Sequence, residues 1–578
     1  MIHRNRMKLM MFSVLLGVTV FSGCSAVSAV STKDAMIPVL PVTQTGQSAE
    51  DTSFRAGPGI AVVATESGRV QGYVQDGIYT YRGIPYAEAV KRFKRAHKVQ
   101  AWTGVKLTVN NGPISPQPIS SFVSEWGEPG RQFEEDNNCQ NLNIWTPGIE
   151  DNHKRPVMVW LHGGGFSTGS SLEAAAYDGA NLAKQGDVVV VSVNHRLNVL
   201  GYLDLSDYGK EYKMSGNVGM YDIVDSLKWI RNNIVHFGGN PDNITVFGES
   251  GGGAKVLALM TIPEATGLFQ KGIVESGATE TMGVHFNKPK FSRRVAALTL
   301  ENLGLLSNQV EQLQTISYKR LNAAASMALE QAGIEQGIKR SLDGKPGGSW
   351  EPVVDGHFLP TDPVLEQGFA EAGKNVSLLI GSNRTEWTSV PEILNIAEAQ
   401  YNNKNTWTEA EVNRKLHEKY GDKTDSIISE FLKAYLNKTK ADALYIDTLI
   451  RNPMRKIMAH KADQGGAPVY AYMFTWDSPV MNGVYMSYHT AEIPFVFFNI
   501  DKAESRIGGG EAARRLEEKM SRAWINFAKT GDPSVEGMPQ WKPYTRENGN
   551  IIIFDNDIRA VSHHDKNLLF LLTPEYTY

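Results

Sequence analysis

The chain has 578 residues, of which 42% are hydrophobic and 21% are charged, and its formal net charge is −4. This composition is typical of a folded globular protein and excludes a largely disordered chain. A weakly negative chain lacks the basic face that phosphate binding requires, so we expect no nucleic-acid partner. At this length, one large elaborated domain and two smaller domains are both possible.

The N-terminal segment has the pattern of an export signal. Three basic residues within the first eight precede an apolar run at 9–21, which is too short to span a bilayer comfortably. Small residues then lead to Cys24, a pattern that resembles the lipidation motif of bacterial lipoproteins. The alternative is ordinary cleavage after Ala29, which would give a periplasmic or secreted protein. Both alternatives export the protein, and we favour a cell-envelope lipoprotein.

These signals divide the chain into three parts. We expect a signal peptide at 1–23, a flexible tether at 24–57 and the folded domain at 58–578. No later segment contains an 18-residue apolar run, so a lipid on Cys24 would be the membrane attachment. Cys139 is the other cysteine of the chain, and we expect it to be a small, buried, free thiol.

The predicted strands change in character along the chain. The first two, at 68–74 and 78–87, resemble an antiparallel edge. Five later segments are short and almost continuously apolar, which is typical of strands buried on both faces of a parallel sheet. These segments are 156–161, 188–194, 243–248, 272–276 and 377–382.

Helical segments alternate with these strands. The clearest is 221–237, in which Ile223, Leu227, Ile230 and Ile234 recur at helical spacing. The alternation of strand and helix predicts an α/β fold, in which a mostly parallel sheet carries helices on both faces.

Two stretches, 290–345 and 391–464, are mainly helical. Strand signals resume after each of them, so we expect insertions that cover the sheet rather than independent domains. The triple glycine at 508–510 has no strand before it and no Lys-Ser/Thr after it, so it does not predict a phosphate-binding loop. We expect neither a cofactor nor a metal.

The pattern Gly-x-Ser-x-Gly occurs twice, around Ser167 in "GFSTG" and around Ser250 in "GESGG". This pattern supplies a nucleophile only in a sharp strand-to-helix turn. Ser250 follows the strand at 243–248 and precedes a segment that can form a helix, whereas small polar loop residues follow Ser167. We therefore predict that Ser250 is the nucleophile and that Ser167 is a loop residue near the mouth of the site.

The glycines just before Ser167 predict an oxyanion hole. Such a hole needs backbone N–H groups in a loop without side chains that would block the approach of a substrate. Gly164 and Gly165 meet this requirement, and the N–H of Gly251, next to the predicted nucleophile, would be a third donor. The alternative is a flexible glycine turn.

A serine nucleophile needs a base and an acid that orients the base. In this class of fold, the chain order is Ser, then Asp or Glu, then His. The histidines that follow Ser250 are His285, His357, His417, His460, His489, His563 and His564. Composition does not choose among them.

Several segments in combination resemble the type-B carboxylesterase family, which includes bacterial para-nitrobenzyl esterases and the cholinesterases. The likeness extends from about Gly68 to the C-terminus. Specific segments include "YRGIPYAEA" (81–89), "VMVWLHGGGF" (157–166), "FGESGGG" (247–253) and "SYHTAEIPFVF" (487–497). The resemblance implies an α/β-hydrolase fold and the hydrolysis of carboxylic esters without a cofactor.

The resemblance also implies, position by position, a triad of Ser250, Glu386 and His489. Asp355 is the rival acid, although it matches a family turn before a Phe-Leu-Pro segment. Ser276 resembles a second serine that the family keeps near the triad. We expect it to donate a supporting hydrogen bond and treat it as a candidate substrate contact.

Departures from the family pattern bear on the site. Gly251 stands where alanine is usual, which leaves the N–H of the oxyanion hole intact. Trp387 replaces a glycine after the acid and is expected to reshape the pocket wall, so Trp387 and Phe166 are candidate substrate contacts. Ser115 stands where the disulfide partner of Cys139 is often found, so the first disulfide of the family pattern is not expected here. The loop that this disulfide closes shapes the alcohol side of the site in cholinesterases, so the resemblance does not imply choline specificity.

The expected activity is two-step acyl transfer from a small-molecule ester through an acyl-enzyme intermediate. Because the base must be neutral, activity should fall on acidification through a pKa within a unit or two of about 6.5. The alternatives are an amidase or peptidase, a lipase, and an esterase-like binding protein without catalysis.

Overall fold

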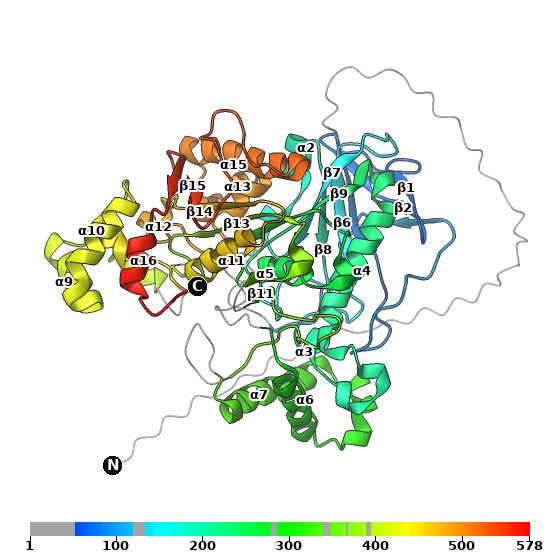
Figure 1. Cartoon of the computed structure of the whole chain (residues 1–578). Coiled ribbons are helices and arrows are strands. Elements are labelled where there is room, and N and C mark those ends of the chain that lie inside the picture. The colour runs from blue at the N-terminus through cyan, green and yellow to red at the C-terminus, as the bar shows by residue number, and fades with distance from the viewer. Residues whose placement is uncertain (1–52, 119–132, 279–285, 339–346, 366–367, 389–394) are drawn as a thin grey trace, which may run out of the picture. The chain divides into compact units, whose positions relative to one another are not determined.

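A central sheet of eleven strands organises the chain (Figure 1). The computed structural model describes residues 53–118, 133–278, 286–338, 347–365, 368–388 and 395–578. These residues belong to one compact unit that spans 50–578. The predicted signal peptide, Cys24, nearly all of the predicted tether, and His285 lie outside the described residues.

The middle of the sheet is parallel and its two edges are antiparallel. From one edge to the other, the strands are β16 (Arg559–Ser562), β15 (Asn550–Phe554), β14 (Val469–Phe474), β13 (Ser377–Asn383), β10 (Lys271–Glu275), β9 (Gly239–Glu249), β7 (Arg155–Leu161), β8 (Val189–Val193), β6 (Asn141–Thr146), β4 (Ile78–Pro85) and β3 (Tyr73–Gln75). Neighbours from β15 to β8 run parallel. The five apolar segments predicted to be buried strands are confirmed as β7, β8, β9, β10 and β13.

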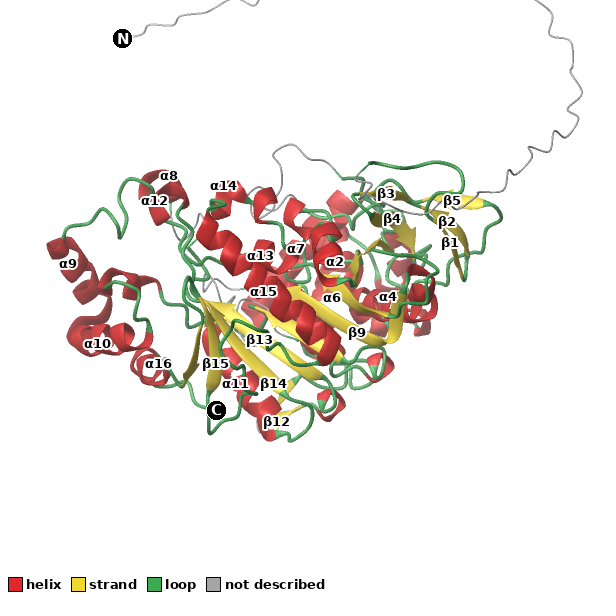
Figure 2. Ribbon diagram, turned by 90° about the horizontal axis from the view of Figure 1, so that it is seen from above, coloured by secondary structure: helices red, strands yellow, loops and turns green. Residues whose placement is uncertain are grey.

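Helices cover both faces of the sheet (Figure 2). One face packs against α4 (Val218–Asn233), α5 (Gly251–Leu259) and α11 (Arg451–Asp463). The other face packs against α2 (Ala180–Gly186), α13 (Ile493–Phe497) and α15 (Glu511–Thr530). Side chains of each strand alternate between the two faces: in β7, Val157 and Val159 join the first core, and Met158 and Trp160 join the second. This explains the continuously apolar strands and confirms the predicted α/β fold.

Two predicted elements differ in detail from the structure. The helix predicted at 221–237 is α4 followed by the short 3-10 helix η5 (Ile234–Phe237). The strand predicted at 68–74 is divided at Gly72. No side chain fits at this position, because a Cβ atom would lie 2.1 Å from the carbonyl oxygen of Thr80. Residues before Gly72 join a small separate sheet of β1 (Val62–Thr65), β2 (Gly68–Gln71) and β5 (Val105–Leu107), and those after it form β3.

The helices of the predicted insertions share the core of the sheet. Side chains of α6 (Pro289–Leu303), α7 (Tyr318–Gln336), α9 (Glu409–Tyr420) and α10 (Thr424–Ala434) belong to the same buried cluster as the first face. The assignment of all of 391–464 to an insertion was wrong, because α11 packs directly on β13 and β14 as a regular helix of the α/β fold.

The remaining strands and α-helices are short. They are β11 (Val364–Leu365), β12 (Gly368–Phe369), α3 (Asn198–Tyr202), α8 (Ile396–Ala399), α12 (Val480–Gly483), α14 (Glu504–Ile507) and α16 (Lys566–Leu572). Of the helices in the described ranges, none is long and apolar enough to cross a membrane.

Candidate active site

Ser250 lies in a sharp turn between β9 and α5, at the carboxyl edge of the sheet. Its φ of 56° and ψ of −123° are rare for a residue other than glycine, and strain of this kind costs about 1–3 kcal/mol. The N–H of Ser250 donates to the carbonyl of Glu275, at the end of β10, over 2.8 Å. The turn therefore presents a half-buried hydroxyl at the N-terminus of α5, where the helix dipole favours negative charge.

The glycines on either side of Ser250 are required by the close approach of β7. A Cβ atom on Gly248 would lie 2.5 Å from the carbonyl oxygen of Leu161, and one on Gly252 would lie 2.0 Å from the same atom. No side chain fits at either position. This close packing of helix against strand is the physical reason for the Gly-x-Ser-x-Gly pattern around Ser250.

A glycine loop follows β7 and lies directly against the Ser250 turn. Gly164 and Gly165 have φ angles of 76° and 60°, which favour glycine. A Cβ atom on Gly163 would lie 3.5 Å from Cβ of Ser250, and one on Gly251 would lie 2.4 Å from Cα of Gly165. The structure thus brings the three predicted oxyanion-hole residues together beside the predicted nucleophile.

Ser167 lies in the continuation of this loop. Its N–H donates to the carbonyl of Gly164 over 3.2 Å, and its own carbonyl accepts a hydrogen bond of 3.1 Å from the Asn198 amide. It also lines a cavity of 530 Å³ together with Asn198 and Trp350. Ser167 therefore occupies a loop, not a strand-to-helix turn.

Glu386 and His489 form a buried hydrogen-bonded pair. The distance between His489 Nδ1 and Glu386 Oε2 is 2.7 Å, and the backbone N–H of His489 donates to the carbonyl of Glu386, also over 2.7 Å. The other carboxylate oxygen accepts from the Ser276 hydroxyl over 2.8 Å and from the Asn383 N–H over 2.7 Å. When Nδ1 carries the proton and donates to the Glu386 carboxylate, Nε2 is left as an acceptor.

The rival acid, Asp355, stabilises a turn instead. One of its carboxylate oxygens accepts the N–H groups of His357, Phe358 and Leu359 over 2.9 to 3.1 Å. The other accepts from the side chain of Asn217 over 3.1 Å. These contacts occupy both oxygens of Asp355, and the structure does not bring Asp355 to His489.

Nε2 of His489 lies 3.2 Å from Oε1 of Glu249. Burial, together with the nearby carboxylates of Glu492 and Glu386, raises the pKa of Glu249 well above its ordinary value. This shift favours the neutral form of Glu249. Within the described residues no hydrogen bond joins Ser250 to His489, and catalytic hydrogen bonds of this type often tighten only when substrate is bound.

Burial shifts both partners of the acid–base pair toward their neutral forms. It lowers the pKa of His489 to about 4, against the opposing effect of Glu492 and Asp447. It raises the pKa of the Glu386 carboxyl, against the hydrogen bonds from Asn383 and Ser276. A neutral imidazole at physiological pH is the form that can accept a proton from a serine.

Trp387, the departure next to the acid, stacks on the imidazole of His489 with a centroid separation of 5.2 Å. Its indole N–H donates to Oδ1 of Asp447 over 3.1 Å. Asp447 in turn accepts the N–H groups of Ile450 and Arg451 at the start of α11. The tryptophan thus packs on the predicted base and connects it to α11 through Asp447. Sequence patterns did not identify Asp447.

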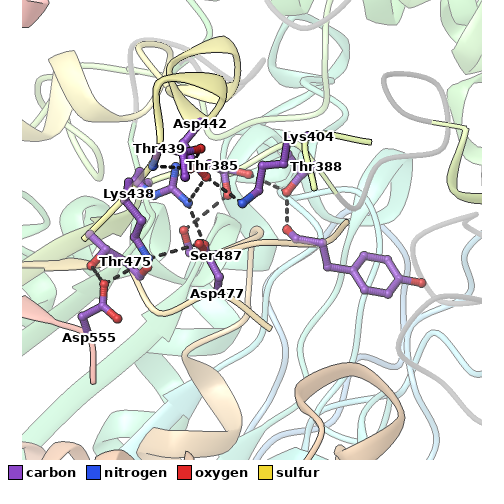
Figure 3. Close-up of polar contacts among 12 residues, drawn as sticks. Thr385, Thr388, Lys404, Lys438, Thr439, Asp442, Thr475, Asp477, Ser487 and Asp555 are labelled. Atoms are coloured by element: carbon purple, nitrogen blue, oxygen red, sulfur yellow. Dashed lines mark hydrogen bonds and ion pairs between the residues drawn. The ribbon is translucent and has the colours of Figure 1, made fainter. Parts of the chain in front are cut away.

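A charged network holds the loop that carries Glu386 (Figure 3). Its cations are Arg384, Lys404 and Lys438, and its carboxylates are Asp442, Asp477 and Asp555. The shortest contact, 2.6 Å, joins the fully buried Arg384 to Asp477. Next to it, the N–H of Thr385 donates to the carbonyl of Ser487 over 3.3 Å. The loops of the acid and the base are therefore fixed to each other.

Two further predicted positions lie in the core. Phe166 is only 1% exposed and packs against Tyr202 and Phe286, so its ring supports the glycine loop from below. Cys139 is a buried free thiol, and burial raises its pKa. The hydroxyl of Ser115 contacts this thiol and accepts the N–H of Leu197 over 3.2 Å.

This arrangement contains the parts that acyl transfer needs. A strained serine, a histidine paired with a carboxylate, and a glycine loop lie at one edge of the sheet. In the part of the chain that the structure describes, no group of three or more His, Cys, Asp or Glu side chains could hold a metal ion.

The sequence matches the model of the carboxylesterase family over residues 60–569. Para-nitrobenzyl esterase of Bacillus subtilis is 34% identical over 506 residues, which cover 86% of this chain and 95% of that protein. Phenmedipham hydrolase of Pseudarthrobacter oxydans is 30% identical over 521 residues, which cover 86% of this chain and 95% of that enzyme.

Solved structures are similar as well. An esterase of Clostridium hathewayi that can hydrolyse aliphatic aromatic polyesters superposes with a TM-score of 0.80 at 35% identity, covering 90% of this chain and 99% of that one. A carboxylesterase of Geobacillus stearothermophilus gives a TM-score of 0.68 at 30% identity, covering 88% and 99%. The chain has the α/β-hydrolase fold, belongs to the carboxylesterase family and is a carboxylic ester hydrolase.

Proposed function

We propose that ester hydrolysis by this chain uses Ser250 as the nucleophile, His489 as the base and Glu386 as the orienting acid. The observation that carries the proposal is the hydrogen bond of 2.7 Å between His489 and Glu386, formed at the edge of the sheet where Ser250 occupies its strained turn. The support from Ser276 and Asn383 fixes the carboxylate that orients the base.

The reaction proceeds in two steps. His489 takes the proton of Ser250, whose oxygen attacks the ester carbonyl, and the resulting oxyanion is held by the N–H groups of Gly164, Gly165 and Gly251. His489 then donates this proton to the departing alcohol. In the second step, His489 activates a water molecule that releases the acid from Ser250.

Labelling with a fluorophosphonate tests this proposal. The probe should modify Ser250, and peptide mass spectrometry should find no label on Ser167. Absence of label from an active preparation would refute the proposed nucleophile, and an inactive, unlabelled protein would favour a non-catalytic binding role. Matched esters and amides, together with emulsified long-chain esters, separate the esterase from an amidase or a lipase.

The substrates of the similar enzymes suggest where a substrate survey should begin. The names of two relatives refer to para-nitrobenzyl esters and to phenmedipham, and the solved esterase hydrolyses aliphatic aromatic polyesters. We propose small esters that carry an aromatic group as the first panel, with the acyl and alcohol parts varied separately.

The acid limb of the pH profile should lie lower than an ordinary histidine would give. His489 is active only when unprotonated, so activity is retained above its pKa and lost as the pH falls through it. Because burial lowers this pKa to about 4, kcat/KM should persist below pH 6.5, the ordinary value for histidine, and decline toward about pH 4. Steady-state kinetics at pH values where circular dichroism shows a folded protein would measure this. A midpoint above 6.5 would contradict the burial effect, and undiminished activity well below pH 4, in a folded protein, would count against His489 as the base.

We further propose that the protein is exported, with a signal peptide at 1–23, a tether at 24–57, the catalytic domain at 58–578 and a lipid on Cys24. The basic and apolar pattern of the first 23 residues and the small residues before Cys24 support this proposal. Metabolic labelling with radioactive palmitate should mark the full chain and not a Cys24→Ala variant. Unlabelled protein that begins after Ala29 would favour ordinary secretion.

A further inference from the structure

The amine of Lys255 lies beneath the glycine loop that follows β7. Lys255 is in α5, one helical turn after Gly251, and it is 0% exposed. Its Nζ donates to the carbonyl of His162 over 2.9 Å and to the carbonyl of Gly165 over 2.7 Å. A buried amine on two backbone carbonyls therefore connects the helix behind Ser250 to both ends of the loop.

The two carbonyls between these contacts are also held. The carbonyl of Gly163 accepts from Nδ1 of His162 over 3.0 Å. The carbonyl of Gly164 accepts the N–H groups of Ser167 and Thr168 over 3.2 and 3.1 Å. In a trans peptide the N–H points opposite to the C=O. Each held carbonyl thus fixes the direction of the N–H of the following residue. The carbonyls of Gly163 and Gly164 fix the N–H groups of Gly164 and Gly165 directly, and the two Lys255 contacts fix the peptides on either side of them.

The glycine loop has no side chains of its own at Gly163, Gly164 and Gly165 that could fix its conformation. Its three glycines carry no side chains, and glycine has more conformational freedom to lose on ordering than any other residue. The loop must nevertheless lie close to α5, since the position of a Cβ atom on Gly251 is only 2.4 Å from Cα of Gly165. Lys255 provides an anchor from outside the loop, since its side chain reaches the loop from α5.

We infer that Lys255 is a positioning residue for the oxyanion hole, and that its amine sets the orientation of the loop by holding the carbonyls of His162 and Gly165. This inference rests on the proposed function, because it assigns the N–H groups of Gly164 and Gly165 to the oxyanion. Lys255 does not touch the reacting atoms, and it acts on the transition state through the loop.

The anchor acts in either protonation state of the amine. Burial lowers the pKa of Lys255 to about 7, against the opposing effect of Glu173. A neutral amine keeps two N–H bonds, one for each carbonyl, and the charged form adds a third N–H. The amine also lies over the ring of Phe166, with Nζ 5.3 Å from the ring centroid.

Replacing Lys255 by methionine tests the inference, because methionine has a similar length and no donor. Oxyanion contacts form in the transition state, so kcat and kcat/KM should fall together by about 10²-fold while KM changes little. Affinity for a trifluoromethyl ketone, whose adduct places an oxyanion in the hole, should fall by a similar factor. Affinity for the hydrolysed acid product should stay within about threefold, because that interaction does not require the hole.

Lys461 provides a matched control. It is also 0% exposed, and its Nζ donates to the carbonyls of Lys374 and Ala467 over 3.0 and 3.2 Å. These partners precede β13 and β14, whereas Ser250 follows the carboxyl end of β9. Lys461→Met should lower the midpoint of thermal unfolding but leave kcat and the affinity for the ketone unchanged. A purely structural role of Lys255 would make the two variants behave alike.

Lys255→Gln keeps two N–H donors on a shorter side chain and should recover part of the activity that Lys255→Met loses. If Lys255→Met does not fold, kcat and the affinity for the ketone are measured on Lys255→Gln instead. Wild-type kcat and ketone affinity in a folded Lys255 variant would overturn the inference while leaving the nucleophile intact. Failure of the fluorophosphonate to label Ser250 in the wild-type protein would instead refute the proposed function, so the two failures are distinguishable.

Discussion

Replacing Ser250 by alanine is expected to lower kcat by about 10⁴-fold or more, because no other hydroxyl occupies the strained turn between β9 and α5. Ser167→Ala should keep most of the activity, since its backbone groups make the hydrogen bonds that shape the loop. Active-site titration with a chromogenic ester would measure both variants. Ser250→Ala removes only a half-buried hydroxyl, so the midpoint of thermal unfolding should change little.

The two variants control for each other, because each removes one hydroxyl from one match to the same sequence pattern. If Ser250→Ala keeps its activity and Ser167→Ala loses it, Ser167 would be the nucleophile. Equal and small losses in both variants would show that neither serine is the nucleophile.

Gly251→Ala is expected to lower kcat by about 10²-fold, although the resembled family usually has alanine at this position. The added Cβ would lie 2.4 Å from Cα and 2.5 Å from N of Gly165, so the glycine loop must move. Displacement of catalytic groups by about 1 Å can cost a factor of this size. Alanine has the higher helix propensity, by about 1 kcal/mol, so poor helix formation cannot account for the loss.

Gly510→Ala is the matched control, because its Cβ would meet only the Gly508 carbonyl at 4.0 Å. That variant should keep wild-type kcat and ketone affinity. If Gly251→Ala also keeps them, then the loop does not need the close approach to α5. A crystal structure of such an active Gly251→Ala variant should show a displaced Gly165, because the added Cβ does not fit beside the present position.

Local patterns were sufficient for the architecture of the sheet centre. Strands buried on both faces must be apolar at every position, and that requirement made β7, β8, β9, β10 and β13 visible in the sequence. The same reasoning was not extended to β14 and β15, whose apolar runs at 469–474 and 550–554 have the same character. The division of 68–74 at Gly72 was not predicted, and the close approach of Gly72 to Thr80 is a contact that no local pattern contains.

The site was only partly accessible to sequence reasoning. The order of strand, serine and glycine-rich helix start distinguished Ser250 from Ser167, because the turn is a local structure. Glu386 and His489 came from the family resemblance, since their distance along the chain is unrelated to their distance in space. The sequence does contain an indication of Lys255, because it is the charged residue within the small apolar segment 251–260.

The sequence by itself determined the fold class, the predicted nucleophile and the glycine loop, because each depends on neighbouring residues and on the pattern of burial. The tertiary structure decided the rest. It paired His489 with Glu386 and Asp355 with a turn, stacked Trp387 on the imidazole, and brought the amine of Lys255 under the loop. These contacts join elements that are far apart in the chain, and their geometry is set by how the helices pack on the sheet.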